Sequence, residues 1–88
     1  MITQIKETIE SAIPNATAHV LDPMNDGQHF EAIVIAPSFT QLSLVKQHQQ
    51  VMNALKEAFT SSVHALKLKT FSPEKWEVEK ENYPFIKS

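Results

Sequence analysis

Eighty-eight residues with a formal charge of −2 can form one small domain, too short for two separate cores or an elaborate enclosed active site. The chain has no cysteine, which excludes a disulfide, a thiolate zinc site and a redox motif of paired cysteines. All eight basic residues are lysines, and a mildly acidic chain without arginine is poorly suited to binding nucleic acid.

The first half of the chain predicts a helix followed by two strands. Apolar residues at three- and four-residue spacing mark an amphipathic helix: Ile2, Ile5, Ile9, Ala12 and Ile13. This helix ends at Pro14-Asn15. Strands are expected over residues 17–21 and 29–36, and alternate residues of the second strand face opposite sides of the sheet. The loop between the strands holds the only glycine, Gly27, where a positive φ is most easily adopted.

The second half begins with a long helix, for which Ser43 is the expected cap. One helical face collects most of its apolar side chains: Leu44, His48, Val51, Leu55 and Phe59, widened by Val45, Met52 and Ala58. Residues 60–62 break this helix, and a third strand is expected over residues 63–70.

The order helix, strand, strand, helix, strand, helix predicts an α+β fold with one small sheet packed against helices. Ser72-Pro73 provides the cap and first residue of the last helix, and Trp76 anchors it. We expect a single domain over residues 1–80 and a loosely ordered C-terminal tail over residues 81–88. No stretch approaches the roughly 18 continuous apolar residues that span a bilayer, so we expect no membrane segment or targeting leader, and a cytoplasmic protein by default.

The strand order brings two histidines to one end of the sheet. The first two strands should form an antiparallel hairpin, whereas the third returns through a long helix, as expected for a parallel neighbour of the second. These two strands then begin side by side, at His29 and His64. Neighbouring strands lie about 4.8 Å apart, so the two imidazoles could converge on one exposed metal ion or cluster. In a chain without cysteine, the remaining ligands would come from outside it.

Four blocks of sequence follow one another between residues 2 and 77. They are HFEAIVI at 29–35, FxxLSxVKxHQxV at 39–51, VHALxLKT at 63–70 and PxxW at 73–76. In this order the blocks resemble the BolA family, and the resemblance covers nearly the whole domain.

The resemblance implies an αββααβα architecture similar to the type II KH domain, with the long helical region split near residues 56–62. It also implies a non-enzymatic adaptor that binds a monothiol glutaredoxin and shares a 2Fe-2S cluster with it, in iron–sulfur trafficking or in iron and redox regulation. The other cluster ligands would be a glutaredoxin cysteine and the thiol of glutathione, so the isolated chain should hold no cofactor. The family's ligand histidine falls on His64, and its variable loop ligand falls on His29.

The sequence departs from the family pattern at the start of the long helix. The family typically has a glycine before this helix and two arginines in it, and the matching positions are Gln41, Leu44 and Gln47. Some members have been linked to DNA binding through this helix, so a KH-like transcriptional regulator is the alternative function. We disfavour it because the loss of both arginines leaves only Lys46 to contact phosphate there.

The other polar residues have simpler interpretations. Lys67 and Lys69 would add nucleic-acid contacts in the alternative function, but a solvated sheet face explains them more simply. His48 is expected to be a buried, hydrogen-bonded structural residue, and His19 a residue of the polar surface.

Each of the two ligand candidates also has a purely structural interpretation. His29 would then be a solvent-facing loop residue, and His64 a strand-edge residue hydrogen-bonded to the backbone. No nucleophile elbow, P-loop or HExxH motif occurs, so we expect no enzyme. The sequence leaves a monomer and a homodimer equally open.

Overall fold

The structure is a computed structural model, and it describes residues 2–58 and 65–86. The elements follow in the order α1 (Ile2–Ala12), β1 (Thr17–Leu21), β2 (His29–Ile35), the 3-10 helix η1 (Pro37–Gln41), α2 (Leu44–Ala58), β3 (Ala65–Phe71), α3 (Pro73–Glu79) and the 3-10 helix η2 (Lys80–Asn82). The expected α+β order is therefore confirmed.

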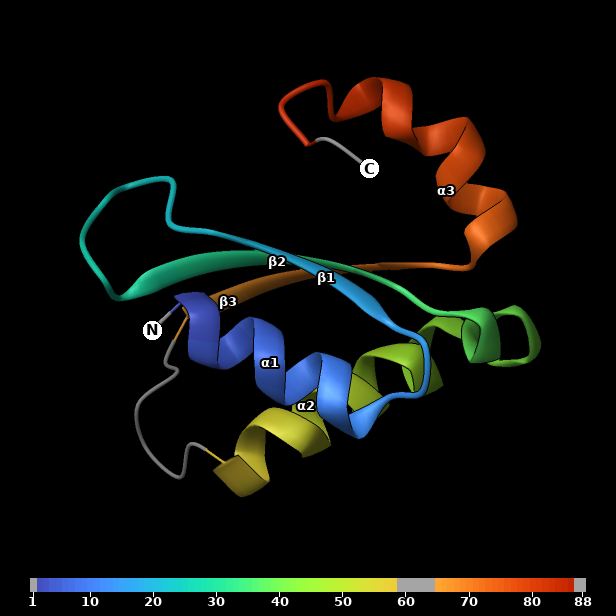
Figure 1. The fold of residues 1–88 in the computed structure, drawn as a ribbon, viewed down its shortest axis with the longest axis horizontal. Helices are drawn as coiled ribbons and strands as arrows, with labels where there is room; N and C mark the ends of the chain where they lie inside the picture. The colour runs from blue at the N-terminus through green and yellow to red at the C-terminus, as the bar shows by residue number, and fades with distance from the viewer. Residues whose placement is uncertain (1, 59–64, 87–88) are drawn as a thin grey trace.

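The three strands form one mixed sheet in the order β1-β2-β3. β1 pairs antiparallel with β2, and β2 pairs parallel with β3, as the connection lengths predicted. Helices α1 and α2 cover one face of the sheet, and α3 lies on the opposite face (Figure 1). The β1–β2 loop and the first residues of β2 and β3 lie at the same end of the sheet (Figure 1).

The central strand β2 is buried on both faces, which explains why its sequence alone did not reveal a single core face. Phe30, Ala32 and Val34 pack against the helices α1 and α2 through residues such as Ile5 and Val51. On the other face, a smaller cluster forms around Trp76, and it includes two residues of β2, Ile33 and Ile35, with Phe71, Tyr83 and Ile86 beside it. The sequence of a strand that is buried between two helical layers is a nearly continuous run of apolar residues.

Helix α2 differs from its predicted face and boundaries. Val51 and Leu55 are buried as expected, whereas Leu44, Val45 and Met52 are exposed. The αββααβα order has two consecutive helices after the second strand. The first of them is the short 3-10 helix η1, and the second, α2, runs without a break to Ala58. The split expected near residues 56–62 is therefore absent up to residue 58, and residues 59–62 lie outside the described part of the chain.

Gln47 explains how η1 joins α2 and the sheet. Its amide nitrogen donates to the carbonyl oxygens of Phe39 (3.0 Å) and Leu42 (2.9 Å), and its oxygen accepts from the hydroxyl of Thr70 (2.7 Å). Gln47 and Thr70 are both buried, and these bonds satisfy the polar groups that burial removes from water. At the start of α2, the hydroxyl of Ser43 accepts from the Lys46 N–H, which confirms the predicted cap.

The C-terminal region packs on the sheet face opposite α1 and α2. The hydroxyl of Ser72 accepts from the Lys75 N–H and caps α3, with Pro73 in the first turn, as predicted. Packing continues beyond residue 80, where the sequence placed the end of the domain, because Tyr83 and Ile86 contact the Trp76 cluster. None of the helices in the two described ranges is long and apolar enough to cross a membrane.

Candidate functional site

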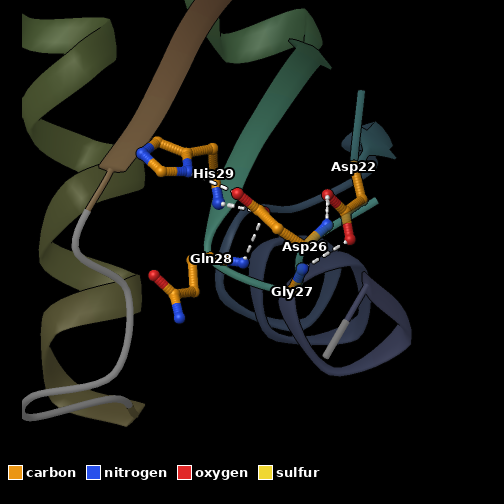
Figure 2. Close-up of polar contacts among 5 residues, drawn as sticks. All are labelled: Asp22, Asp26, Gly27, Gln28 and His29. Atoms are coloured by element: carbon orange, nitrogen blue, oxygen red, sulfur yellow. Dashed lines mark hydrogen bonds and ion pairs between the residues drawn. The ribbon is translucent and has the colours of Figure 1, made fainter. Parts of the chain in front are cut away.

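The loop between β1 and β2 is built by the carboxylates of Asp22 and Asp26. Asp22 accepts hydrogen bonds from the backbone N–H groups of Asp26 (3.2 Å) and Gly27 (2.9 Å). Asn25 and Gly27 adopt positive φ angles of 53° and 69°, which glycine tolerates without cost and asparagine more readily than most residues. The positive φ expected at Gly27 is confirmed, and the loop delivers the chain into β2 in one defined conformation (Figure 2).

Asp26 fixes the first residue of β2, His29. One carboxylate oxygen accepts from the backbone N–H groups of Gln28 (2.9 Å) and His29 (3.0 Å), and the other lies 2.7 Å from Nδ1 of the imidazole. Hydrogen bonds from the His29 and Gln28 N–H groups, and then from the ring, hold the pKa of Asp26 well below its usual range. Asp26 is therefore a carboxylate at neutral pH, able only to accept.

The His29 ring stands at the edge of the sheet with its side chain 54% exposed. Its second nitrogen, Nε2, points away from Asp26 and toward the side where β3 begins (Figure 2). The ring is thus held at one nitrogen and presented outward at the other, an arrangement common for histidines that bind metals.

The parallel register places the start of β3 beside His29. Ala65 is the Cα partner of His29, and His64 directly precedes Ala65 in the sequence. His64 lies outside the described residues, so its shared ligation with His29 stays a prediction.

The described residues supply too few ligands for a metal site of their own. Within residues 2–58 and 65–86, no group of three or more histidine, aspartate or glutamate side chains is arranged to hold a metal ion. A depression of about 370 Å³ lies beside His29 and is lined mainly by apolar side chains, including Pro23, Met24 and Leu66. This end of the sheet therefore offers an imidazole next to an apolar surface, and any metal would need further ligands.

The lysines of the nucleic-acid alternative lie on different parts of the molecule. Lys67 and Lys69 project from β3 on the side of η2: Lys67 is 3.8 Å from the carboxylate of Glu31, and Lys69 lies 5.6 Å from the centre of the Tyr83 ring. Lys46 is in the first turn of α2, on the opposite side of the sheet (Figure 1). The fold does not gather the three ammonium groups on one surface.

Two further histidines differ from their predicted environments. His48 is half-buried and not fully buried. His19 is also half-buried, and its ring stacks on Trp76 with 6.2 Å between the centroids. Burial and then the charge of Lys6 lower the pKa of His19, while Glu10 opposes this shift. The alternation of β1 suggested a polar outer face because it did not reveal that α3 and its neighbours cover that face.

Comparisons with known proteins agree with this architecture. A family model described as BolA-like protein matches residues 4–75. The DNA-binding transcriptional regulator BolA of Haemophilus influenzae is 34% identical over 56 residues, which cover 64% of this chain and about half (54%) of that protein.

Two solved structures are similar over most of the chain. A BolA protein homologue from Coxiella burnetii has a TM-score of 0.75 and 35% identity, with 88% of this chain and 96% of that chain covered. The solution structure of yeast Fra2 has a TM-score of 0.69 and 28% identity, with 94% and 91% covered. The likeness therefore extends over the sheet and the helices on both of its faces.

Proposed function

We propose that this chain, which belongs to the BolA-like protein family, is a non-enzymatic adaptor. It binds a monothiol glutaredoxin and shares a 2Fe-2S cluster with it. His64 supplies one ligand in this proposal and His29 a second, and a glutaredoxin cysteine and the thiol of glutathione supply the others. The cluster is the cargo of the complex, which serves iron–sulfur trafficking or iron and redox regulation.

The observation that carries the proposal is the register between β2 and β3. His29 begins one strand, and its Cα partner Ala65 is the residue next to His64 in the sequence. Adjacent strands lie about 4.8 Å apart, which is close enough for two side chains at this edge to reach one cluster.

The chemistry of the donor set fits a shared cluster. Neutral imidazole binds iron in 2Fe-2S centres of the Rieske type, where it replaces thiolate and removes negative charge. His29 presents such an imidazole, exposed and already hydrogen-bonded at its other nitrogen. Because the chain has no cysteine, the thiolates must come from a partner, which agrees with a protein that acts only in a complex.

The test is reconstitution of the cluster with a glutathione-loaded monothiol glutaredoxin, followed by visible circular dichroism. We expect the wild-type chain to give a cluster spectrum that differs from that of glutaredoxin loaded alone. His64→Ala should abolish this difference, and His29→Ala should weaken it. His48→Ala, on α2, is the matched control because it removes an imidazole away from this edge.

One outcome would contradict the proposal, and a second would show a structural effect of the substitutions. An unchanged spectrum in His64→Ala would remove that residue from the ligand set. An equal loss in the control and in the two edge variants would indicate damage to the fold in place of lost ligation. Far-ultraviolet circular dichroism of each variant alone separates these cases.

A nucleic-acid role is the second candidate because the Haemophilus relative is named a DNA-binding transcriptional regulator. The α2 surface argues against it here. Gln47 takes one of the positions where the family typically has arginine, and it is buried with its amide bonded to η1 and Thr70. The other such position is Leu44, which is exposed but apolar. Lys46 therefore remains the only cation in the first two turns of α2.

Binding to duplex DNA at physiological ionic strength decides between the two candidates. We expect weak binding that falls steeply with salt, and little change when Lys46 is replaced by glutamine. Tight binding that weakens in Lys46→Gln would favour the nucleic-acid role.

A further inference from the structure

We propose that Asp26 is the positioning residue for His29: it keeps the proton of the neutral imidazole on Nδ1 and so leaves Nε2 as the ligand atom. This inference rests on the proposed function, since the ligand role of His29 is part of it. It adds a residue outside the ligand set that decides whether the ring can bind a metal at all.

A neutral imidazole carries its proton on one nitrogen, and only the other nitrogen has a lone pair to give to a metal. The hydrogen bond made by the protonated nitrogen selects between the two forms. Nδ1 of His29 lies 2.7 Å from a carboxylate oxygen of Asp26. Because a carboxylate accepts but does not donate, Nδ1 must donate, and Nε2 is left unprotonated.

The position of the Asp26 carboxylate is itself fixed. Its other oxygen accepts from the N–H groups of Gln28 and His29, so both oxygens are engaged. The backbone of Asp26 is held in turn, because Asp22 accepts from its N–H. Figure 2 shows these contacts running in series from Asp22 through Asp26 to the ring. Positioning of a ligand to within a fraction of an ångström requires this kind of support.

The orientation of the ring agrees with the same role. Nε2 points away from the loop, toward the side where β3 begins (Figure 2). In the described part of the chain no hydrogen bond to Nε2 is formed, and the side chain is 54% exposed. The unprotonated nitrogen is therefore the one that faces outward.

Asp26→Asn tests the role with little change of shape. The amide oxygen can still accept from the two backbone N–H groups, but the amide nitrogen then faces Nδ1 and donates to it. Nδ1 must become the acceptor, and the proton moves to Nε2, the atom that ligation needs. An asparagine in place of an orienting aspartate has this effect on the histidine of a serine protease triad.

Asp22→Asn is the matched control. It removes one negative charge from the same loop, as Asp26→Asn does, and its side chain bonds only to backbone N–H groups. Loss of charge or a looser loop would affect both variants, whereas a change of tautomer would affect Asp26→Asn alone.

The first measurement is long-range proton–nitrogen NMR of the imidazoles in the full, metal-free chain, at a pH where the spectra show the rings to be neutral. We expect His29 to carry its proton on Nδ1 in the wild type and in Asp22→Asn, and on Nε2 in Asp26→Asn. A neutral wild-type ring with its proton on Nε2 would overturn the inference without any variant or cluster.

The second measurement is the rate at which a chelator removes iron from the complex reconstituted with glutathione-loaded monothiol glutaredoxin. We expect Asp26→Asn to lose the cluster about tenfold faster or more, which is the usual effect of removing a partner of a metal-binding histidine. Asp22→Asn loses one acceptor of the loop but keeps the tautomer of His29, so it should lose the cluster more slowly than Asp26→Asn. A reversed tautomer with an unchanged rate would overturn this inference and leave the proposed function intact. Failure of the wild-type chain to form any cluster would overturn both.

Discussion

His19 and His29 lie on neighbouring strands of one sheet in opposite environments. His29 is exposed at the end of β2, where two carboxylates organise the loop through hydrogen bonds to backbone N–H groups. His19 is packed on the aromatic cluster of Trp76, and its Nε2 is buried without a hydrogen-bond partner in the described ranges. The loop therefore holds an exposed imidazole, whereas the aromatic cluster holds an imidazole packed against Trp76.

The difference shows how a small domain separates binding from stability. Polar contacts in water contribute little free energy each, but they fix geometry. Apolar burial contributes most of the stability, but it disfavours charge. The predictions below change each region in turn, beginning with the largest expected effect.

Removal of the central side chain of the aromatic cluster should have the largest effect. Trp76 is 5% exposed and packs against Phe71 and Tyr83. Trp76→Ala should lower the free energy of unfolding by about 3–5 kcal/mol, measured by urea denaturation. Val78→Ala on the same helix, at a side chain 73% exposed, is the control and should change stability by about 0.5 kcal/mol or less. Equal losses would mean that Trp76 is not the anchor of this face.

Backbone strain in the loop should give the next effect. Gly27 has a φ of +69°, and a Cβ built there would meet nothing within 4 Å, so only the backbone conformation opposes a side chain. Gly27→Ala should cost about 1 kcal/mol in the same denaturation measurement. Gly27→Asn should cost less, because asparagine tolerates this conformation, as Asn25 does in the same loop. Alanine at no cost would indicate that the loop changes conformation without penalty.

Loss of the Asp22 carboxylate should act locally. Asp22→Ala removes the acceptors for the N–H groups of Asp26 and Gly27, which are exposed bonds worth about 1 kcal/mol together. Amide hydrogen exchange should accelerate at Asp26, Gly27 and His29, while the amides of the central strand from Phe30 onward keep their protection. Uniform acceleration across the sheet would show that loop and core unfold together.

A pH effect from His19 should be the smallest. Its lowered pKa means that the unfolded chain binds more protons than the folded chain between the folded value and about 6.5. Stability should therefore be complete above about pH 6.5 and decrease as the pH falls below it. His19→Phe keeps an aromatic ring on Trp76 and cannot take up the proton, so its stability should fall less between about pH 7.5 and 5.5. Identical pH dependence in both proteins would contradict this assignment.

Local sequence patterns predicted the elements well because local physics determines them. The spacing of Ile5 and Ile9 indicates a helix in any fold, and Ser72-Pro73 begins a helix by capping its own first turn. The antiparallel and parallel pairing of the strands was also predicted, because connection length limits how strands can pair. The exposed positions of Leu44 and Val45 were not, since exposure depends on what packs against a helix.

The candidate site was predicted only in part. His29 was identified from its place at the start of a strand, and the family resemblance implied its role. Asp26 was missed, although it precedes His29 by three residues, because an aspartate before a glycine is typical of any turn. Its function depends on the direction of a side chain within a folded loop.

The sequence by itself determined the fold class, the order of elements and the place of His29 at the start of a strand. These follow from spacing, turn residues and chain connectivity, which are properties of the chain. The tertiary structure decided which polar residues are buried and which imidazole nitrogen faces outward. His19 became a packing residue, and His29 gained a carboxylate partner, because both outcomes depend on neighbours that only folding brings together.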